Sequence, residues 1–174
     1  MTIAERKKQE NISEYIIHMY QTEDLVRAFE FDLNQITEYV IKHIPGDENE
    51  KKQLILWYAE VITQMSEEHI KKEGHLKSTQ EIVTRLLNLK NVLITTDQEF
   101  IAVWKAAKKA VESNRDKTGA NEIQVCLNGI YGLLLLRLNG KPVSDEILKQ
   151  ADQFGNVLSY LSYKYKQQKF TTPN

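Results

Sequence analysis

Cysteine, proline and long apolar runs are all scarce in this chain of 174 residues. Because Cys126 is its only cysteine, the chain cannot form an internal disulfide, which suits a reducing compartment. The longest apolar run, Leu133 to Leu136, is far shorter than the roughly 20 residues that span a bilayer. Polar residues follow the basic stretch 6–8, where a signal peptide would have its apolar segment. We therefore expect a cytoplasmic protein with no membrane-spanning helix.

An excess of charge of one sign is also lacking, because 23 basic residues face 24 acidic ones and the net charge is −1. Such a balance does not favour nucleic acid or an anionic membrane as the main partner. Basic residues do gather on the helix predicted over 97–117, and they keep nucleic-acid binding open as a weaker alternative. A solvated helix face is the interpretation that we favour for them.

Strands are not expected, because no useful length of chain alternates between polar and apolar residues, whereas helical spacing recurs throughout. Helix starts are indicated by polar caps, mostly followed by Glu or Gln three positions later, at Asp32, Asp47, Ser78, Thr96, Asn121 and Ser144. Glycines that follow periodic segments indicate helix ends, as at Gly119 and Gly140. These signals predict one all-α domain over 1–168 with a frayed tail over 169–174. About seven helices are expected, over 2–30, 33–43, 48–73, 79–94, 97–117, 122–138 and 145–168.

The helix predicted over 122–138 is apolar on nearly every side, which is typical of a helix at the centre of a helical domain. We therefore predict an irregular bundle around this helix, with Leu134 and Leu135 largely inaccessible. Glycine inside a helix costs roughly 1 kcal/mol relative to alanine. Gly129, Gly132 and Gly155 therefore predict a close contact between the helices over 122–138 and 145–168.

Arg137 is a permanently charged residue in the most apolar stretch of the sequence. A buried guanidinium needs a carboxylate or carbonyl partner, or must reach water. Because a bidentate carboxylate suits it best, we predict that Arg137 pairs with Glu23 or Asp24 of the first helix.

A candidate polar or ligand site comes from two parts of the chain. Tyr20, Glu23, Asp24 and Arg27 form a polar band across the apolar stripe of the first helix, and His69, Glu73 and His75 lie near the end of the helix over 48–73. The first group could line a ligand pocket or pair with Arg137. The second could form an acid–base or metal cluster, or simply act as buried and turn residues. We favour the structural interpretation of both.

Motifs for metal binding and for familiar catalysis are missing. No Glu-x-x-His pair, His-Glu-x-x-His motif, nucleophile elbow or glycine-rich phosphate loop occurs. Cys126 lies in an apolar helix without a charged neighbour in sequence, so we interpret it as a small buried residue. We predict no catalytic residue, no metal and no cofactor.

Several stretches, taken in their order and spacing, resemble a known family. They are Tyr15, 19–28 (MYQTEDLVRA), Trp57-Tyr58, Glu73-Gly74-His75-Leu76 and 131–138 (YGLLLLRL). The family comes from Bacteroidetes bacteria and is catalogued only as a domain of unknown function, and the resemblance runs through nearly the whole chain. It implies an all-helical, bacterial, cytoplasmic protein with no assigned activity, and no functional residue carries over from it.

Together these observations favour a non-enzymatic interaction or regulatory module, with a protein partner or a second copy of the chain as the partner. The first alternative is a small-molecule-binding protein or enzyme that uses Glu23, Asp24, Arg27, His69 and His75. An enclosed pocket lined by those residues would favour that alternative, and an exposed apolar patch would favour the interaction module.

Overall fold

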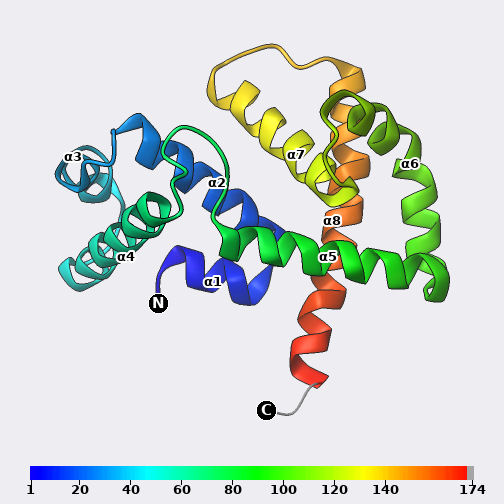
Figure 1. The fold of residues 1–174 in the computed structure, drawn as a ribbon, viewed down its shortest axis with the longest axis horizontal. Coiled ribbons are helices and arrows are strands. Elements are labelled where there is room, and N and C mark those ends of the chain that lie inside the picture. Colours follow the sequence, from blue (N-terminus) through cyan, green and yellow to red (C-terminus); the bar gives the residue numbers. More distant parts are fainter. Residues whose placement is uncertain (172–174) are drawn as a thin grey trace. The chain divides into compact units, whose positions relative to one another are not determined.

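The computed structural model describes residues 1–171, apart from the side chains of residues 116–118 and 169–171. Every element within these residues is helical, which confirms the all-α prediction (Figure 1). The elements are α1 (Ile3–Glu10), α2 (Ile12–Ala28), α3 (Leu33–Tyr39), the 3-10 helix η1 (Ile41–His43), α4 (Glu48–Glu67), α5 (Lys77–Thr96), α6 (Gln98–Thr118), α7 (Glu122–Leu138) and α8 (Asp145–Thr171). None of these helices is long and apolar enough to cross a bilayer.

Side-chain caps begin several helices where the sequence predicts them. At α4, Asp47 and Glu50 form a reciprocal capping box, in which each carboxylate accepts a hydrogen bond from the other residue's backbone N–H. Asp32, Asn121 and Ser144 accept from first-turn amides of α3, α7 and α8. Two starts differ from the prediction: the cap of α6 is Asp97 instead of Thr96, and α5 begins at Lys77, ahead of Ser78.

Two helix ends differ from the prediction because residues other than glycine take the left-handed conformation. The sequence predicts a helix over 48–73, but α4 ends at Glu67 and His69 has a φ of 58°. The N–H of Ile70 then bonds to the carbonyl of Met65 at 3.1 Å, which is the longer bond of a Schellman motif. Glu30, with a φ of 51°, ends α2 in the same way. A sequence indicates a helix end of this kind only where glycine or a small polar residue occupies the left-handed position.

The chain divides into two compact units. Unit 1 contains residues 1–10 and 14–81, and unit 2 contains residues 11–13 and the chain from Ile82 onward. The helix predicted over 2–30 is interrupted at Asn11, so that α1 and α2 are separate. Both α2 and α5 contribute residues to each unit. A single domain over 1–168 stays a prediction. Of the expected tail, residues 169–171 belong to α8 and residues 172–174 lie outside the described residues.

Unit 1 is built on apolar side chains from α2, α3, η1, α4 and the segment that leads into α5. Its buried core consists of Met19, Val26, Ile36, Ile41, Tyr58, Val61, Met65 and Leu76. The α2 and α4 members recur at helical spacing, as the sequence predicts. Full burial of an apolar side chain of this size contributes roughly 1.5–3 kcal/mol, so this core holds the four helical elements and the following segment in place.

In unit 2, α6, α7 and α8 pack on one another (Figure 1). A Cβ atom on Gly129 would lie 2.4 Å from Phe154 Cδ2, so α7 and α8 approach each other as closely as the sequence predicts. A Cβ on Gly155 would lie 3.9 Å from Ile130 Cδ1, an ordinary contact across the same pair of helices. The prediction is wrong at Gly132, where a Cβ would have no atom within 4 Å.

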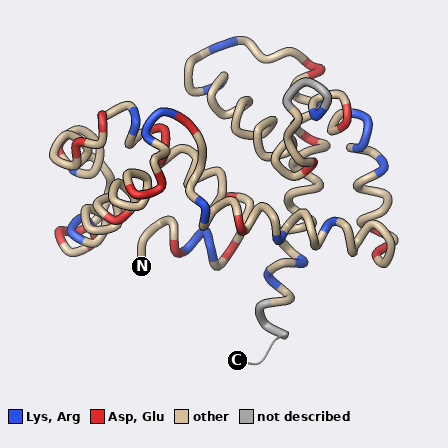
Figure 2. Tube along the Cα trace, viewed as in Figure 1, with Lys and Arg blue, Asp and Glu red and all other residues tan. Residues whose placement is uncertain are grey.

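The expectation that α7 is the buried centre of the fold is wrong for its second half. Ile123, Cys126 and Leu127 are inaccessible, but Leu135 and Leu138 are 38% and 67% exposed, and Leu134 is only half-buried. The inaccessible residues of α7 all precede Gly129, where Phe154 of α8 meets the helix. Most of α7 is uncharged (Figure 2), because no charged residue lies between Glu122 and Arg137.

Candidate functional site: the polar cluster of unit 1 and the leucine end of α7

Unit 1 brings together five of the predicted site residues, which we call the α2 cluster: Tyr20, Glu23, Asp24 and Arg27 from α2, and His75 from the segment between α4 and α5. Glu23 is at its centre and is fully buried. Its Oε2 lies 2.6 Å from Nδ1 of His75, and its Oε1 accepts a hydrogen bond of 3.0 Å from the N–H of Leu76. Both carboxylate oxygens therefore have partners.

His75 is held on a second side by Tyr20. Their rings are stacked, with centroids 3.7 Å apart and planes 21° from parallel. The Tyr20 hydroxyl accepts a hydrogen bond of 3.1 Å from Nε2 of Gln80 in the first turns of α5. Burial and the charge of Glu23 together raise the pKa of the nearby Tyr15 hydroxyl. The imidazole is thus fixed by a carboxylate and an aromatic face, with 30% of its side chain exposed.

Arg27 holds the backbone that leads from α4 to α5. Its Nη2 donates to the carbonyl oxygens of Ile70 at 3.2 Å and of Gly74 at 2.5 Å. Its Nη1 donates to Asp24 Oδ1 at 3.0 Å. Since Gly74 has a φ of 96°, which side chains disfavour, the carbonyl at this bend depends on a backbone that only glycine adopts easily. Arg27 therefore ties the two ends of the 70–74 segment to α2.

The structure does not join the remaining candidates to the α2 cluster. His69 and Glu73 are exposed in the segment after α4, whereas the carboxylate of Glu23 is buried and meets His75 and Leu76. The predicted pairing of Arg137 is wrong. Arg137 is exposed, while Glu23 and Asp24 are bonded by His75, Leu76 and Arg27 of their own unit. The expectation failed because His75 and a backbone N–H satisfy the buried acid, and neither partner stands out in a sequence.

Chemically, the α2 cluster resembles a clamp more than a reaction centre. A carboxylate bound to Nδ1 orients an imidazole whose Nε2 could exchange a proton. The other polar groups already bond to backbone atoms or to one another. Within the described residues, no three His, Cys, Asp or Glu side chains come close enough to hold a metal ion.

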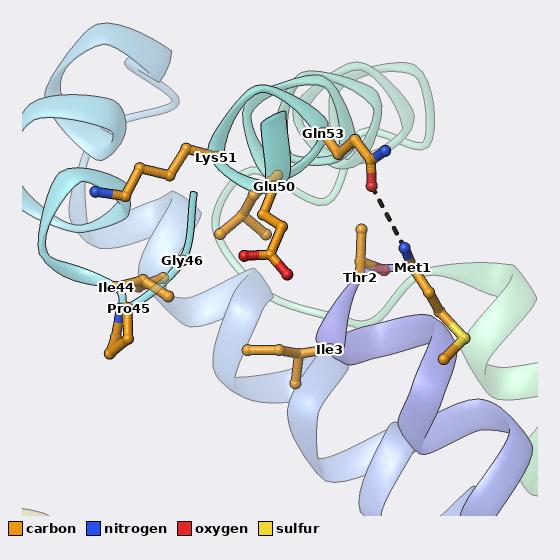
Figure 3. A pocket seen from close by; sticks show the side chains of 10 residues that line it. Met1, Thr2, Ile3, Ile44, Pro45, Gly46, Glu50, Lys51 and Gln53 are labelled. Carbon is orange, nitrogen blue, oxygen red and sulfur yellow. Dashed lines mark hydrogen bonds between the residues drawn. The ribbon is translucent and has the colours of Figure 1, made fainter. Parts of the chain in front are cut away.

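A pocket of about 90 Å³ lies elsewhere in unit 1, between the N-terminal residues and the start of α4 (Figure 3). Ile3, Ile44, Pro45 and Leu54 contribute its apolar lining. The carboxylate of Glu50 points into it, but one of its oxygens accepts the N–H of Asp47 in the capping box. None of the predicted site residues lines this pocket, and no local pattern in the sequence indicates it, because its walls come from three separate segments.

Unit 2 holds a buried ion pair that sequence reasoning missed. Lys90 is 4% exposed, binds the carboxylate of Glu122, and lies with its ammonium 4.3 Å from the centroid of the Trp104 ring. The positive charge is therefore matched by a carboxylate and an aromatic face. The sequence does contain a signal for this pair, because Lys90 lies in the same helical stripe as the apolar residues Leu86 and Leu93.

The basic face predicted on α6 is partly neutralised by acids of the same unit. Lys108 lies 3.7 Å from Glu112, and Arg115 lies 4.0 Å from Glu122. The side chain of Lys117 lies outside the described residues. These pairs support a solvated face more than a nucleic-acid surface.

The last turns of α7, residues 132–138, form what we call the leucine end. Leu135 and Leu138 are exposed, and Arg137 is the one polar residue in this stretch. An exposed apolar helix surface of this kind is typical of a protein interaction site.

Comparison with protein families matches nearly the whole chain. The model of a family described as Domain of unknown function (DUF4924) matches residues 1–171, and so includes both units. The resemblance expected from the sequence is confirmed to that extent, while a Bacteroidetes origin stays a prediction. Neither the curated proteins nor the solved structures contain a match.

Proposed function

The chain belongs to the family described as Domain of unknown function (DUF4924), and we propose that it is a non-enzymatic interaction module that binds a protein surface through the leucine end of α7. The observation that carries this proposal is the exposure of Leu135 and Leu138 in the last turns of α7, where Arg137 is the one polar residue between positions 132 and 138. Burial of apolar surface is the main driving force of protein association. We also propose a cytoplasmic location, which the single cysteine supports.

The alternative, a small-molecule site in the α2 cluster, has weaker support. Such a site needs polar groups that are free to bind a ligand. Glu23 already has partners on both oxygens, and Arg27 donates to two carbonyls and a carboxylate. His69 and Glu73, which this alternative requires, are exposed and apart from Glu23.

The proposal is tested by site-specific photo-cross-linking in cells. A photoreactive phenylalanine analogue replaces Leu138, the cells are irradiated, and covalent adducts are separated by size and identified by mass spectrometry. We expect one discrete adduct, because a docked partner covers this side chain.

The matched control places the same analogue at Val92 of α5, which is also apolar and is 57% exposed. We expect no discrete adduct there. Equal adduct patterns at both positions would show that the leucine end binds nothing specific.

A further inference from the structure

The near-neutral charge of the chain is the sum of two units of opposite sign (Figure 2). Unit 1 contains sixteen acidic and ten basic residues, which give it a net charge of −6. Unit 2 contains eight acidic and thirteen basic residues, which give it a net charge of +5. Surfaces of opposite charge attract and orient one another, so each unit favours a partner that resembles the other unit in charge.

An open groove of about 540 Å³ lies on unit 1, and we call it the α1–α4 groove. Its lining includes Glu5 and Gln9 of α1, and Gln53, Leu56, Trp57 and Glu60 of α4. The spacing of these residues places them on one face of each helix. Leu56 is 66% exposed and Trp57 is half-buried, so the groove has an accessible apolar floor.

The rim of the α1–α4 groove is acidic. Glu60 is exposed and has no ion pair within the described residues, and Glu5 accepts a hydrogen bond of 2.6 Å from the N–H of Thr2. The one positive group among the lining residues is the N-terminal ammonium, 3.4 Å from Oε1 of Gln53. An occupant that combines an apolar or aromatic side chain with a positive charge therefore suits this groove.

The last turns of α8, residues 159–168, offer that combination, and we call them the basic end of α8. No acidic residue follows Asp152 in the sequence. Tyr163 is 59% exposed, and the exposed Lys166 follows it by three positions, so both lie on one face of the helix. Lys164 is bound to Asp97 at 3.0 Å, whereas Lys166 has no ion pair within the described residues.

We propose that the basic end of α8 in one copy of the chain docks in the α1–α4 groove of a second copy. The ring of Tyr163 packs on Leu56 and Trp57, and Lys166 pairs with Glu60 on the rim. Because the contact joins unlike surfaces, it is heterologous, and each copy offers one groove and one basic end. The docking does not use the leucine end of α7, so it goes beyond the proposed function.

The charges of unit 1 favour this occupant over others. Nucleic acid and anionic membranes carry the same sign as the rim of the groove and are repelled by it. A second copy supplies an aromatic side chain and an unpaired ammonium on one helix face. Tyrosine is also a residue type that is enriched at protein interfaces, since it has an apolar body and a polar tip.

The contact is small, so the association is weak. One aromatic side chain and one exposed ion pair belong to the lower end of interface sizes, below about 1,200 Å², and we expect a dissociation constant on the order of 100 µM. Salt screens exposed charges, so raising NaCl from about 50 to about 500 mM should increase this constant at least threefold. Sedimentation equilibrium of the whole chain measures both values.

Charge reversal tests which residues meet. Glu60→Lys and Lys166→Glu should each weaken the association at least about tenfold, because each brings like charges together. The two changes in the same chain restore an opposite pair, and the association should return close to that of the unchanged chain. The control is Glu81→Lys, which changes the charge of unit 1 equally at an exposed position outside the groove and should have little effect.

A mixing experiment tests whether the contact joins unlike surfaces. Leu56→Lys disables the groove and Tyr163→Ser disables the basic end, and both positions are exposed, so the melting temperatures should not fall. Each variant alone should be monomeric at the concentrations that are measured. Their equimolar mixture should form dimers, because one chain keeps its basic end and the other keeps its groove.

Three results would overturn the self-docking. They are a chain that stays monomeric up to about 1 mM, a double reversal that associates no better than the single ones, and a mixture that stays monomeric. A photoreactive analogue at Leu56, in cells that overproduce the chain, should give an adduct of twice the mass of the chain. An adduct with a different protein in its place would show that the groove has another occupant.

One further variant separates this inference from the proposed function. Leu138→Asp changes the leucine end and should leave the self-association unchanged. If it abolished the association, the second copy would bind at the leucine end and the docking in the groove would be wrong. The photo-cross-link at position 138 tests the leucine end by itself, so either surface can fail while the other stands.

Discussion

Glu23 and Leu76 are 53 positions apart in the chain, yet a buried carboxylate oxygen of Glu23 accepts the backbone N–H of Leu76 at 3.0 Å. The bond fixes the segment that enters α5 against α2. It also explains how a fully buried acid is tolerated, because the other oxygen meets His75. A polar group buried without partners would cost several kcal/mol.

Removing this acid should therefore destabilise unit 1. We expect Glu23→Ala to cost about 3–5 kcal/mol in the free energy of unfolding, because it leaves the N–H of Leu76 and the imidazole of His75 without their partner. Urea denaturation followed by circular dichroism measures the change.

The neighbouring acid is the control for Glu23. The side chain of Asp24 is 51% exposed and pairs with Arg27 one turn along the helix. Asp24→Ala should cost about 0–1 kcal/mol, as exposed pairs do. If the two alanine variants lost the same stability, the carboxylate of Glu23 would not hold the Leu76 segment.

Gly129→Ala should destabilise unit 2, because the new Cβ would meet the Phe154 ring at 2.4 Å. Overpacking costs about 1–3 kcal/mol, and the better helix propensity of alanine returns about 1 kcal/mol. Adding Phe154→Leu to the same chain should recover part of the lost stability. Thermal and urea unfolding of the single and double variants would show this. Gly132→Ala, where no atom is near, should instead raise the stability of the monomer. A gain of stability at both glycines would contradict the close approach of α7 and α8.

Asp97 should make stability depend on pH below about 4. Hydrogen bonds from the N–H of Phe100 and the hydroxyl of Tyr160, followed by Lys164, lower the pKa of Asp97 to about 2. A carboxyl whose pKa is lower when folded stabilises the protein above its ordinary pKa of about 3.9, and that contribution is lost as the pH falls towards 2.

The test of this pH dependence is Asp97→Asn, which keeps a side-chain cap for α6 but does not titrate. We expect the free energy of unfolding of the variant to fall less steeply than that of the unchanged chain between pH 4 and 2. Parallel curves would mean that Asp97 has an ordinary pKa in the folded protein. Urea titrations at each pH give both curves.

Cys126 should react with thiol reagents only after unfolding. It is inaccessible, and burial, with the charge of Glu122 next, raises its pKa to about 12. The reactive thiolate is therefore almost absent at pH 8. We expect the native chain to react with a chromogenic disulfide at least about a hundredfold more slowly than the urea-unfolded chain. Ser159→Cys, at an exposed position of α8, supplies a fast-reacting control.

Much of the fold could be predicted from local signals. The capping box of Asp47 and Glu50 and the left-handed Gly119 and Gly140 depend only on residues a few positions apart. The end of α4 could not be found in this way, because His69 takes a conformation that glycine and asparagine usually mark. The interruption at Asn11 could not be found either, because no proline or glycine marks it in the sequence.

The sequence identifies residues of the candidate site, but it does not predict which of them come into contact. The apolar stripe of α2 shows that Glu23 is an unusual acid, and His75 follows a glycine at a helix end, so both could be named. Their contact spans 52 positions and depends on where α4 ends, which no local pattern indicates. The mistaken partner, Arg137, came from the assumption that all of α7 is buried. Apolar composition predicts a tendency to bury surface, and it does not say whether the covering surface belongs to the same chain.

Ser13 has an unexpected place in the division of the chain. It belongs to unit 2, where its hydroxyl lies 2.7 Å from that of Ser162, although the residues that follow it in α2 belong to unit 1. A gene fragment that starts at codon 82 would therefore leave Ser162 without this neighbour, and one that stops at codon 81 would cut through α5. Neither unit can be moved into another protein by a single cut, and we expect evolution to have inherited the pair together, as a family match that extends over both units suggests.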